Sequence, residues 1–222
     1  MRKLAIHFSL LCMFLVSAAK GQELRPTYSE HQDLSYYLQP DGMKTAIQTP
    51  ADWAKRREHV LAAMQVVMGP LPKPDKPVPL GMKVLEEQTF DGYTRQLISY
   101  HTDSAEREVR AFLFIPKSDG KRLPAMLCLH QTTGIGKGEP AGLGGNPNLH
   151  YALHLAQRGY VTLAPDYPSF GDYKYEFLKE YGYISGSMKA IADNMRSVDL
   201  LQSLAVVDRE RIGVIGHSLG GA

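Results

Sequence analysis

Residues 211–222 read RIGVIGHSLGGA, a strand-like run of apolar and small residues that leads into a glycine-rich turn. Within it, Gly216–Gly220 has the G-x-S-x-G spacing of a nucleophile elbow, in which a strand turns sharply into a helix. The serine at the tip of such an elbow holds a strained backbone conformation that exposes its hydroxyl, and flanking glycines are needed because a Cβ would collide with neighbouring backbone. The stretch therefore predicts Ser218 as a nucleophile.

Buried strands alternate with helices in the residues before the elbow. The continuous apolar runs Ala125–Leu129 and Tyr160–Ala164 suit strands covered on both faces, and Ile212–Ile215 continues the series. Helices are predicted between them at 148–158 and Ser187–Val206. The apolar stripe expected on the second helix comprises Met188, Ile191, Met195, Val198, Leu201 and Ala205.

Three further strands are predicted upstream, where the hydrophobic period changes to two. These are Met82–Thr89, Tyr93–Tyr100 and Val109–Pro116, and Asp91-Gly92 between the first two is a hairpin signal. Hairpins followed by β-α-β-α-β predict an α/β fold, with a mostly parallel sheet, antiparallel N-terminal strands and helices on both faces.

The N-terminal third contains a helix signal and a leader signal. Thr49, Pro50 and Asp52 form a helix start of the capping-box kind, and residues 22–48 are predicted to wrap the domain surface. One face of the helix is expected to dock on a core through Trp53, Val60, Leu61, Met64 and Val67.

Residues 1–21 have the pattern of a signal peptide. Arg2 and Lys3 precede the apolar run Leu4–Val16, which is shorter than the roughly 18 residues of a membrane span. Small residues precede a cleavage position after Gly21, with Ala19 as the alternative. The expected organisation is a signal peptide at 1–21, an N-terminal extension with a helix and a proline-rich connector at 22–79, and a domain at 80–222. A secreted or periplasmic protein without membrane attachment after cleavage follows, and Cys128 is then the only cysteine.

The composition is that of a globular chain without a polyanionic partner. Hydrophobic residues make up 44% and charged residues 22%. Removing the three basic residues of 1–21 from the 25 in the chain leaves 22 against 23 acidic residues. This balance argues against nucleic-acid binding.

The predicted site surrounds Ser218. Its oxyanion would be held by the backbone N–H of Leu219 and by a second donor in the loop after Ala125–Leu129, for which Thr132 is favoured and Gln131 is the alternative. His130, Gln131 and Asp166 are candidates for a pocket. For His130, a structural role in the loop is favoured over that of a catalytic base. For Asp166, a purely structural turn is at least as good an interpretation as a role in positioning the active-site wall or the substrate.

Two motifs that suggest bound groups are interpreted otherwise. His150 and His154 have a zinc-compatible spacing, but no glutamate lies between them as in a metalloprotease. The loop Gly134–Gly145 lacks the serine or threonine of a P-loop and is expected to be a flexible rim of the site. The tyrosine-rich segment 169–183 could line a pocket or only cover the sheet. No metal or cofactor is expected.

Taken in order, Leu129-His130, the Asp166 turn and Gly216–Gly221 resemble the α/β-hydrolase superfamily, and within it the dienelactone-hydrolase and acetyl-xylan-esterase-like group. The resemblance covers residues 80–222, and it departs from the common His-Gly pair because Gln131 follows His130. It implies a secreted serine hydrolase that cleaves small-molecule or carbohydrate esters.

In that superfamily the acid and the histidine of the triad follow the nucleophile, and only four residues follow Ser218. The expectation is therefore the N-terminal part of a longer hydrolase. The alternatives are a prolyl-oligopeptidase-type serine peptidase, for which the fewer than 80 residues before the sheet leave no room for a propeller, and a truncated non-catalytic chain.

Overall fold

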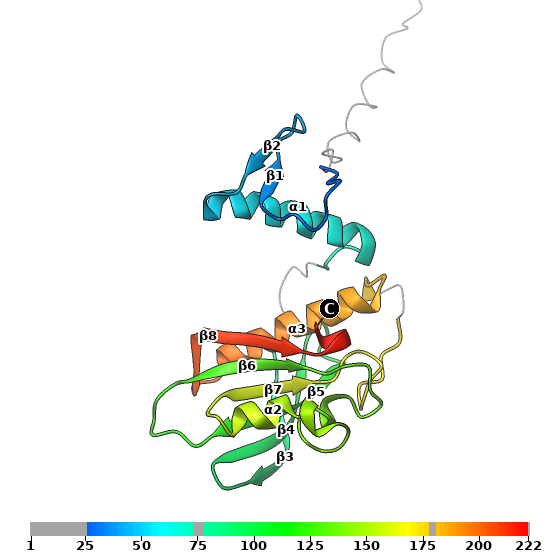
Figure 1. Ribbon diagram of the computed structural model, residues 1–222. Helices are drawn as coiled ribbons and strands as arrows, with labels where there is room; N and C mark the ends of the chain where they lie inside the picture. The colour runs from blue at the N-terminus through cyan, green and yellow to red at the C-terminus, as the bar shows by residue number, and fades with distance from the viewer. Residues whose placement is uncertain (1–25, 73–77, 178–180, 222) are drawn as a thin grey trace, which may run out of the picture. The chain divides into compact units, whose positions relative to one another are not determined.

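The computed structural model describes residues 26–72, 78–177 and 181–221 (Figure 1). The predicted signal peptide and most of the connector lie outside these residues. The chain divides into two compact units, residues 1–67 and 68–222, whereas the sequence places the boundary in the connector.

The N-terminal unit contains a hairpin that the sequence did not predict. Strand β1 (Tyr36–Leu38) pairs antiparallel with β2 (Lys44–Ala46), within the stretch expected only to wrap the surface. Helix α1 (Pro50–Met68) follows. Its predicted cap is confirmed, since the Asp52 amide donates to Thr49 Oγ1 over 3.2 Å and the Thr49 amide donates to Asp52 Oδ2 over 3.1 Å.

Within the N-terminal unit, the apolar face of α1 that is expected to dock on a core is left exposed, and its docking stays a prediction. Trp53 is 43% exposed and Val67 is 84% exposed. The helix instead buries Arg56, whose guanidinium carbon lies 3.4 Å from the ring centroid of Tyr28 and 5.7 Å from that of Tyr36. A planar, weakly hydrated guanidinium stacks well on aromatic faces, and this accounts for a buried charge in that position.

A six-stranded sheet forms the core of the C-terminal unit, in the order β3-β4-β5-β7-β6-β8 (Figure 1). The predicted meander is confirmed, because β3, β4 and β5 pair antiparallel in sequence order. Strand β7 joins β5 antiparallel, and β6 pairs parallel with both β7 and β8. The strands are β3 (Lys83–Thr89), β4 (Tyr93–His101), β5 (Glu108–Pro116), β6 (Leu123–Leu129), β7 (Val161–Pro165) and β8 (Val207–Gly216).

The sheet is covered on both faces, which confirms the predicted fold class. Side chains alternate along β6, so that Leu127 packs in the cluster that includes residues of α3 (Gly186–Ser203) while Cys128 packs in the cluster of α2 (Tyr151–Ala156). The two helices lie on opposite sides of the sheet in Figure 1. Because β6 lies between β7 and β8 and is parallel to both, the carboxyl ends of these three strands lie at the same edge of the sheet.

Two details of these elements differ from prediction. Strand β8 begins at Val207, five residues before the predicted start at Ile212, and its pairing with β6 has a register shift between Leu123 and Ala125. In α3, Met195 is 53% exposed although it belongs to the expected apolar stripe, and part of the buried face is polar.

No helix within the described ranges has the length and apolar character to cross a bilayer.

Candidate active site

The turn after β8 has the backbone geometry expected of the elbow. Ser218 begins a short 3₁₀ helix (Ser218–Gly221) and has φ of 52°, a left-handed conformation that among described non-glycine residues only Ser169 shares. A Cβ on Gly216 would lie 1.9 Å from the carbonyl oxygen of Gly220, and a Cβ on Gly220 would lie 2.1 Å from that of Leu129. Only glycine fits either position, and Ser218 is left exposed at the tip.

The loop after β6 lies against this turn. The close approach of Gly220 to the carbonyl oxygens of Leu129 and His130 brings the segment carrying Thr132 next to the segment carrying Leu219. The two residues assigned as oxyanion donors thus come from neighbouring segments, and their role remains a prediction.

His130 is fully buried and organises the loop. Its Nδ1 donates to the carbonyl oxygen of Gln131 over 2.5 Å, and its Nε2 accepts the amide N–H of Tyr167 over 3.0 Å. Burial is the main cause that lowers the pKa of His130, which favours the neutral ring these bonds require. Because both ring nitrogens are engaged, the geometry supports the structural interpretation of His130.

Asp166 is also buried, and both oxygens of its carboxylate accept hydrogen bonds. Oδ1 accepts the amide N–H of Lys137 over 2.8 Å, while Oδ2 accepts Lys137 Nζ over 2.7 Å and the amide N–H of Asp172 over 3.0 Å. Lys137 Nζ also reaches Asp172 Oδ2 at 2.6 Å, and this hydrogen bond is the largest cause that lowers the pKa of Asp172. Asp166 therefore ties two loops together, as the structural alternative for that residue required.

The glycine-rich loop 134–145 is not a loose rim. Lys137 and Glu139 are both buried within it, and the Glu139 carboxylate accepts the amide N–H of Asn146 over 2.8 Å. Gly145 must remain glycine, since a Cβ there would lie 2.3 Å from Glu139 Oε1. Neither Lys137 nor Glu139 was predicted as a site residue, although two charged residues inside a glycine-rich run were a usable signal.

Gln131 links this loop to the elbow. Its Nε2 donates to Glu139 Oε2 over 2.9 Å, and its Oε1 lies 2.7 Å from His217 Nδ1. A carboxylate only accepts hydrogen bonds, so Glu139 fixes the orientation of the Gln131 amide and makes His217 Nδ1 the donor. The residue before Ser218 is thus attached to the loop after β6.

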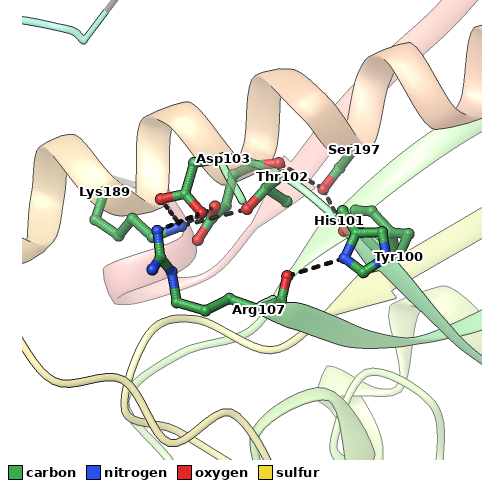
Figure 2. Close-up of polar contacts among 8 residues, drawn as sticks. Tyr100, His101, Thr102, Asp103, Arg107, Lys189 and Ser197 are labelled. Atoms are coloured by element: carbon green, nitrogen blue, oxygen red, sulfur yellow. Dashed lines mark hydrogen bonds and ion pairs between the residues drawn. The ribbon is translucent and has the colours of Figure 1, made fainter. Parts of the chain in front are cut away.

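A second polar cluster surrounds Lys189 of α3 (Figure 2). The fully buried ammonium pairs with Asp193, lies 3.1 Å from Asp103 Oδ2, and donates to Thr102 Oγ1 over 3.3 Å. Arg107 Nη2 lies 3.4 Å from Asp103 Oδ1. These contacts join the turn after β4 to α3, and none of them was predicted from the sequence.

The tyrosine-rich segment packs around the same lysine. Tyr173, Tyr175 and Tyr183 are buried, with Lys189 Nζ between 5.0 and 5.7 Å from their ring centroids. Burial is the main cause that raises the pKa of each of these tyrosines. The rings therefore cover the sheet and enclose a charge, which is the second of the two interpretations of that segment.

His150 and His154 stay close together, with ring centroids 6.2 Å apart. His150 Nε2 is 2.9 Å from the carbonyl oxygen of Gly144. The described part of the chain contains no group of three or more histidine, cysteine, aspartate or glutamate side chains arranged to hold a metal.

Among the described residues, the Ser218 hydroxyl has no partner that could act as its general base. Within residues 26–72, 78–177 and 181–221, no hydrogen bond joins the Ser218 hydroxyl to a histidine or a carboxylate. A serine hydroxyl is a weak nucleophile until a base removes its proton. The arrangement can thus position an attacking oxygen beside backbone donors, and activation needs a further group.

Comparisons with known proteins agree with this fold. A sequence model of the prolyl oligopeptidase family matches residues 148–222. A candidate acetyl xylan esterase from Bacteroides fragilis superposes with a TM-score of 0.62 at 24% identity, over 78% of this chain and 49% of its own. A glucuronoyl esterase from Solibacter usitatus gives a TM-score of 0.59 at 16% identity, over 90% of this chain and 60% of its own.

The chain thus spans about half to three fifths of the length of these two structures. No curated protein sequence matches it. At these identities the likeness establishes a shared fold, and residue roles must be argued from the chain itself.

Proposed function

From its α/β-hydrolase fold we propose that the chain is a serine hydrolase, specifically a carboxylic-ester hydrolase of the acetyl xylan esterase or dienelactone hydrolase type, with Ser218 as the nucleophile. The observation that carries the proposal is the left-handed conformation of Ser218 at the end of β8, enclosed by two glycines that admit no side chain. Strain of this kind persists where surrounding structure enforces it, and it clusters at active sites.

The proposed reaction is acyl transfer through the serine. Ser218 Oγ loses its proton to a base and attacks the ester carbonyl carbon, and the negative charge moves to the carbonyl oxygen, which the N–H groups of Leu219 and Thr132 stabilise. The tetrahedral intermediate collapses, the ester C–O bond breaks, and the alcohol leaves with a proton returned by the base. Water then hydrolyses the acyl-enzyme by the same route.

The base and its carboxylate partner are proposed to lie beyond residue 222, in the order that this fold uses. Two observations support a continuation. The chain spans only part of the structures it resembles. In addition, Val214 is 64% exposed and Ile215 37% exposed although they point to opposite faces of β8, so neither side chain is buried on this last strand of the sheet.

Ester substrates are proposed for two reasons. The two solved structures compared above are an acetyl xylan esterase candidate and a glucuronoyl esterase. The near balance of charges in residues 22–222 also fits a small-molecule or carbohydrate substrate. The leader pattern of residues 1–21 supports secretion or export to a periplasm.

A serine peptidase is the second candidate, because the matching family model is that of prolyl oligopeptidases. That match covers α2, β7, α3 and the elbow, which both classes of enzyme share. A chain whose turnover is confined to peptide substrates would favour this candidate.

Fluorophosphonate labelling tests the nucleophile. The natural full-length protein should be labelled at Ser218 and should hydrolyse p-nitrophenyl acetate, and Ser218→Ala should abolish both. The 222-residue chain should label poorly, because none of its described residues places a base on Ser218. Robust labelling of the short chain would contradict the proposed position of the base, and labelling of another residue in the full-length protein would overturn the assignment of Ser218.

A further inference from the structure

The hydrogen-bonded chain from Glu139 through Gln131 to His217 has no part in the acyl-transfer steps above. It starts at a buried carboxylate and ends at the residue directly before Ser218. Glu139 is itself fixed, since its other oxygen accepts the Asn146 N–H and Gly145 packs against it without room for a Cβ. The anchor is thus rigid, and the end that it holds is next to the nucleophile.

We infer that Gln131 and His217 are positioning residues that set the spacing of the two halves of the oxyanion hole. This inference rests on the proposed function. One proposed donor, Leu219, lies two residues after His217, and the other, Thr132, lies directly after Gln131. A bond of 2.7 Å between the two side chains therefore connects the two backbone segments at the point where both must face one oxygen atom.

The physical reason for such a bond is the precision that an oxyanion hole needs. Donors act when they lie at hydrogen-bond distance from the position that the oxyanion will occupy, and they add most when no reorganisation is required at the moment of reaction. The elbow and the loop are separate segments joined by the packing of Gly220 against the β6 carbonyl groups. Packing sets how close they come, and the side-chain bond resists sliding of one past the other.

This role would explain why Gln131, and not the glycine of the common His-Gly pair, follows His130. A glycine after His130 would have no side chain to reach the elbow, whereas Gln131 supplies an oxygen to His217 and a nitrogen to Glu139. All three members are needed for a defined orientation, because a free amide could turn either its oxygen or its nitrogen toward His217.

The test uses the full-length protein with two disrupting variants and one conservative variant. His217→Phe and Gln131→Met remove the bond. His217→Asn keeps a donor, because its side-chain nitrogen lies two bonds beyond Cβ, as Nδ1 of histidine does. The readouts are kcat and KM for p-nitrophenyl acetate, the rate of fluorophosphonate labelling, and thermal unfolding, with His154→Phe as an exposed control on α2.

Loss of an entire oxyanion donor costs about 10²- to 10³-fold in kcat. Misplacing donors that are still present should cost less, and we expect kcat and the labelling rate to fall about tenfold in His217→Phe and Gln131→Met, with KM unchanged. His217→Asn should recover most of the loss, and the melting temperatures should stay near that of the wild type.

The outcomes separate this inference from the proposed function. If the wild type labels at Ser218 and both disrupting variants react at its rate, the positioning role is refuted and the nucleophile stands. If the rate falls but His217→Asn recovers none of it, the Nδ1 bond is not the cause, and the inference fails. A wild type that neither labels nor hydrolyses esters overturns both.

Discussion

Replacing Lys189 by methionine is expected to destabilise the full-length protein by about 3 kcal/mol at pH 7. The ammonium is fully buried, with Asp193 and Asp103 as its carboxylate partners and Thr102 as a further acceptor. Methionine fills a similar volume, so the cost arises mainly from carboxylates left without their cation. Removing one partner of a buried ion pair costs about 3–5 kcal/mol.

The structure selects the lower end of that range. Asp103 keeps Arg107 at 3.4 Å after the substitution, so only Asp193 loses its cation entirely. Ordinary domains have about 5–15 kcal/mol of stability, and a loss of about 3 kcal/mol should leave the variant folded but measurably weaker.

The loss should also depend on pH. Burial is the main cause that raises the pKa of Asp193, and Lys189 opposes this shift, so removing the lysine raises that pKa further. A carboxyl whose pKa is higher in the folded state loses stability as pH rises through that value and recovers it as pH falls. The deficit should therefore be largest at neutral pH and should shrink toward acid pH, where the folded protein can hold Asp193 protonated.

Urea unfolding of the wild type and the variant at pH 7 and at about pH 5 measures both effects. Lys174→Met is the matched control, because Lys174 is exposed and lies in the same tyrosine-rich segment, and it should change stability by less than about 0.5 kcal/mol. A Lys189→Met deficit below about 1 kcal/mol at pH 7, or one that is equal at both pH values, would refute the reasoning.

Three further predictions follow from the site and the core. Gly220→Ala should abolish fluorophosphonate labelling, since its Cβ would lie 2.1 Å from the Leu129 carbonyl oxygen, whereas Gly134→Ala, with open space around it, should label normally. Burial lowers the pKa of His130, so the unfolding free energy from urea titrations should fall as pH drops below about 6.5, and His130→Gln should flatten that slope. Cys128 is buried with a raised pKa and should react with a thiol reagent only after unfolding in urea.

The elements of the sheet domain could be predicted because their signals are local. Period-two runs and Asp91-Gly92 located the meander, and the continuous apolar runs located β6 and β7 within a few residues. The hairpin β1-β2 had no such signal. Its strands are three residues long, too short for a hydrophobic period to show. Tyr36 and Tyr37 are buried, and cations of α1 lie over their rings, Arg56 over Tyr36 and Lys55 over Tyr37.

The buried polar residues of the sheet domain could not be predicted from the sequence, for a different reason. A hydrophobic-periodicity argument assigns charged residues to solvent, and Lys189 with Asp193 four residues later looks like an ordinary surface pair of a helix. Ser197, four residues further on, is also buried and hydrogen-bonded to Tyr100, so the three positions form one polar row that contacts the end of β4 and the turn after it. Met195 is exposed, and the partners of the polar row lie about 90 residues away in the sequence.

Around the elbow, a local sequence motif and long-range contacts of the folded chain both define the site. The glycines of the elbow were predictable because G-x-S-x-G is a local sequence pattern. The collision at Gly216 is local, since it involves the carbonyl oxygen of Gly220, whereas the collision at Gly220 involves the distant carbonyl oxygen of Leu129. The partners Gln131 and Glu139 were not, because the bond to His217 joins residues 86 positions apart in the sequence. A motif can therefore identify the attacking atom, while the alignment of the groups that must stabilise its product depends on contacts that only the folded chain supplies.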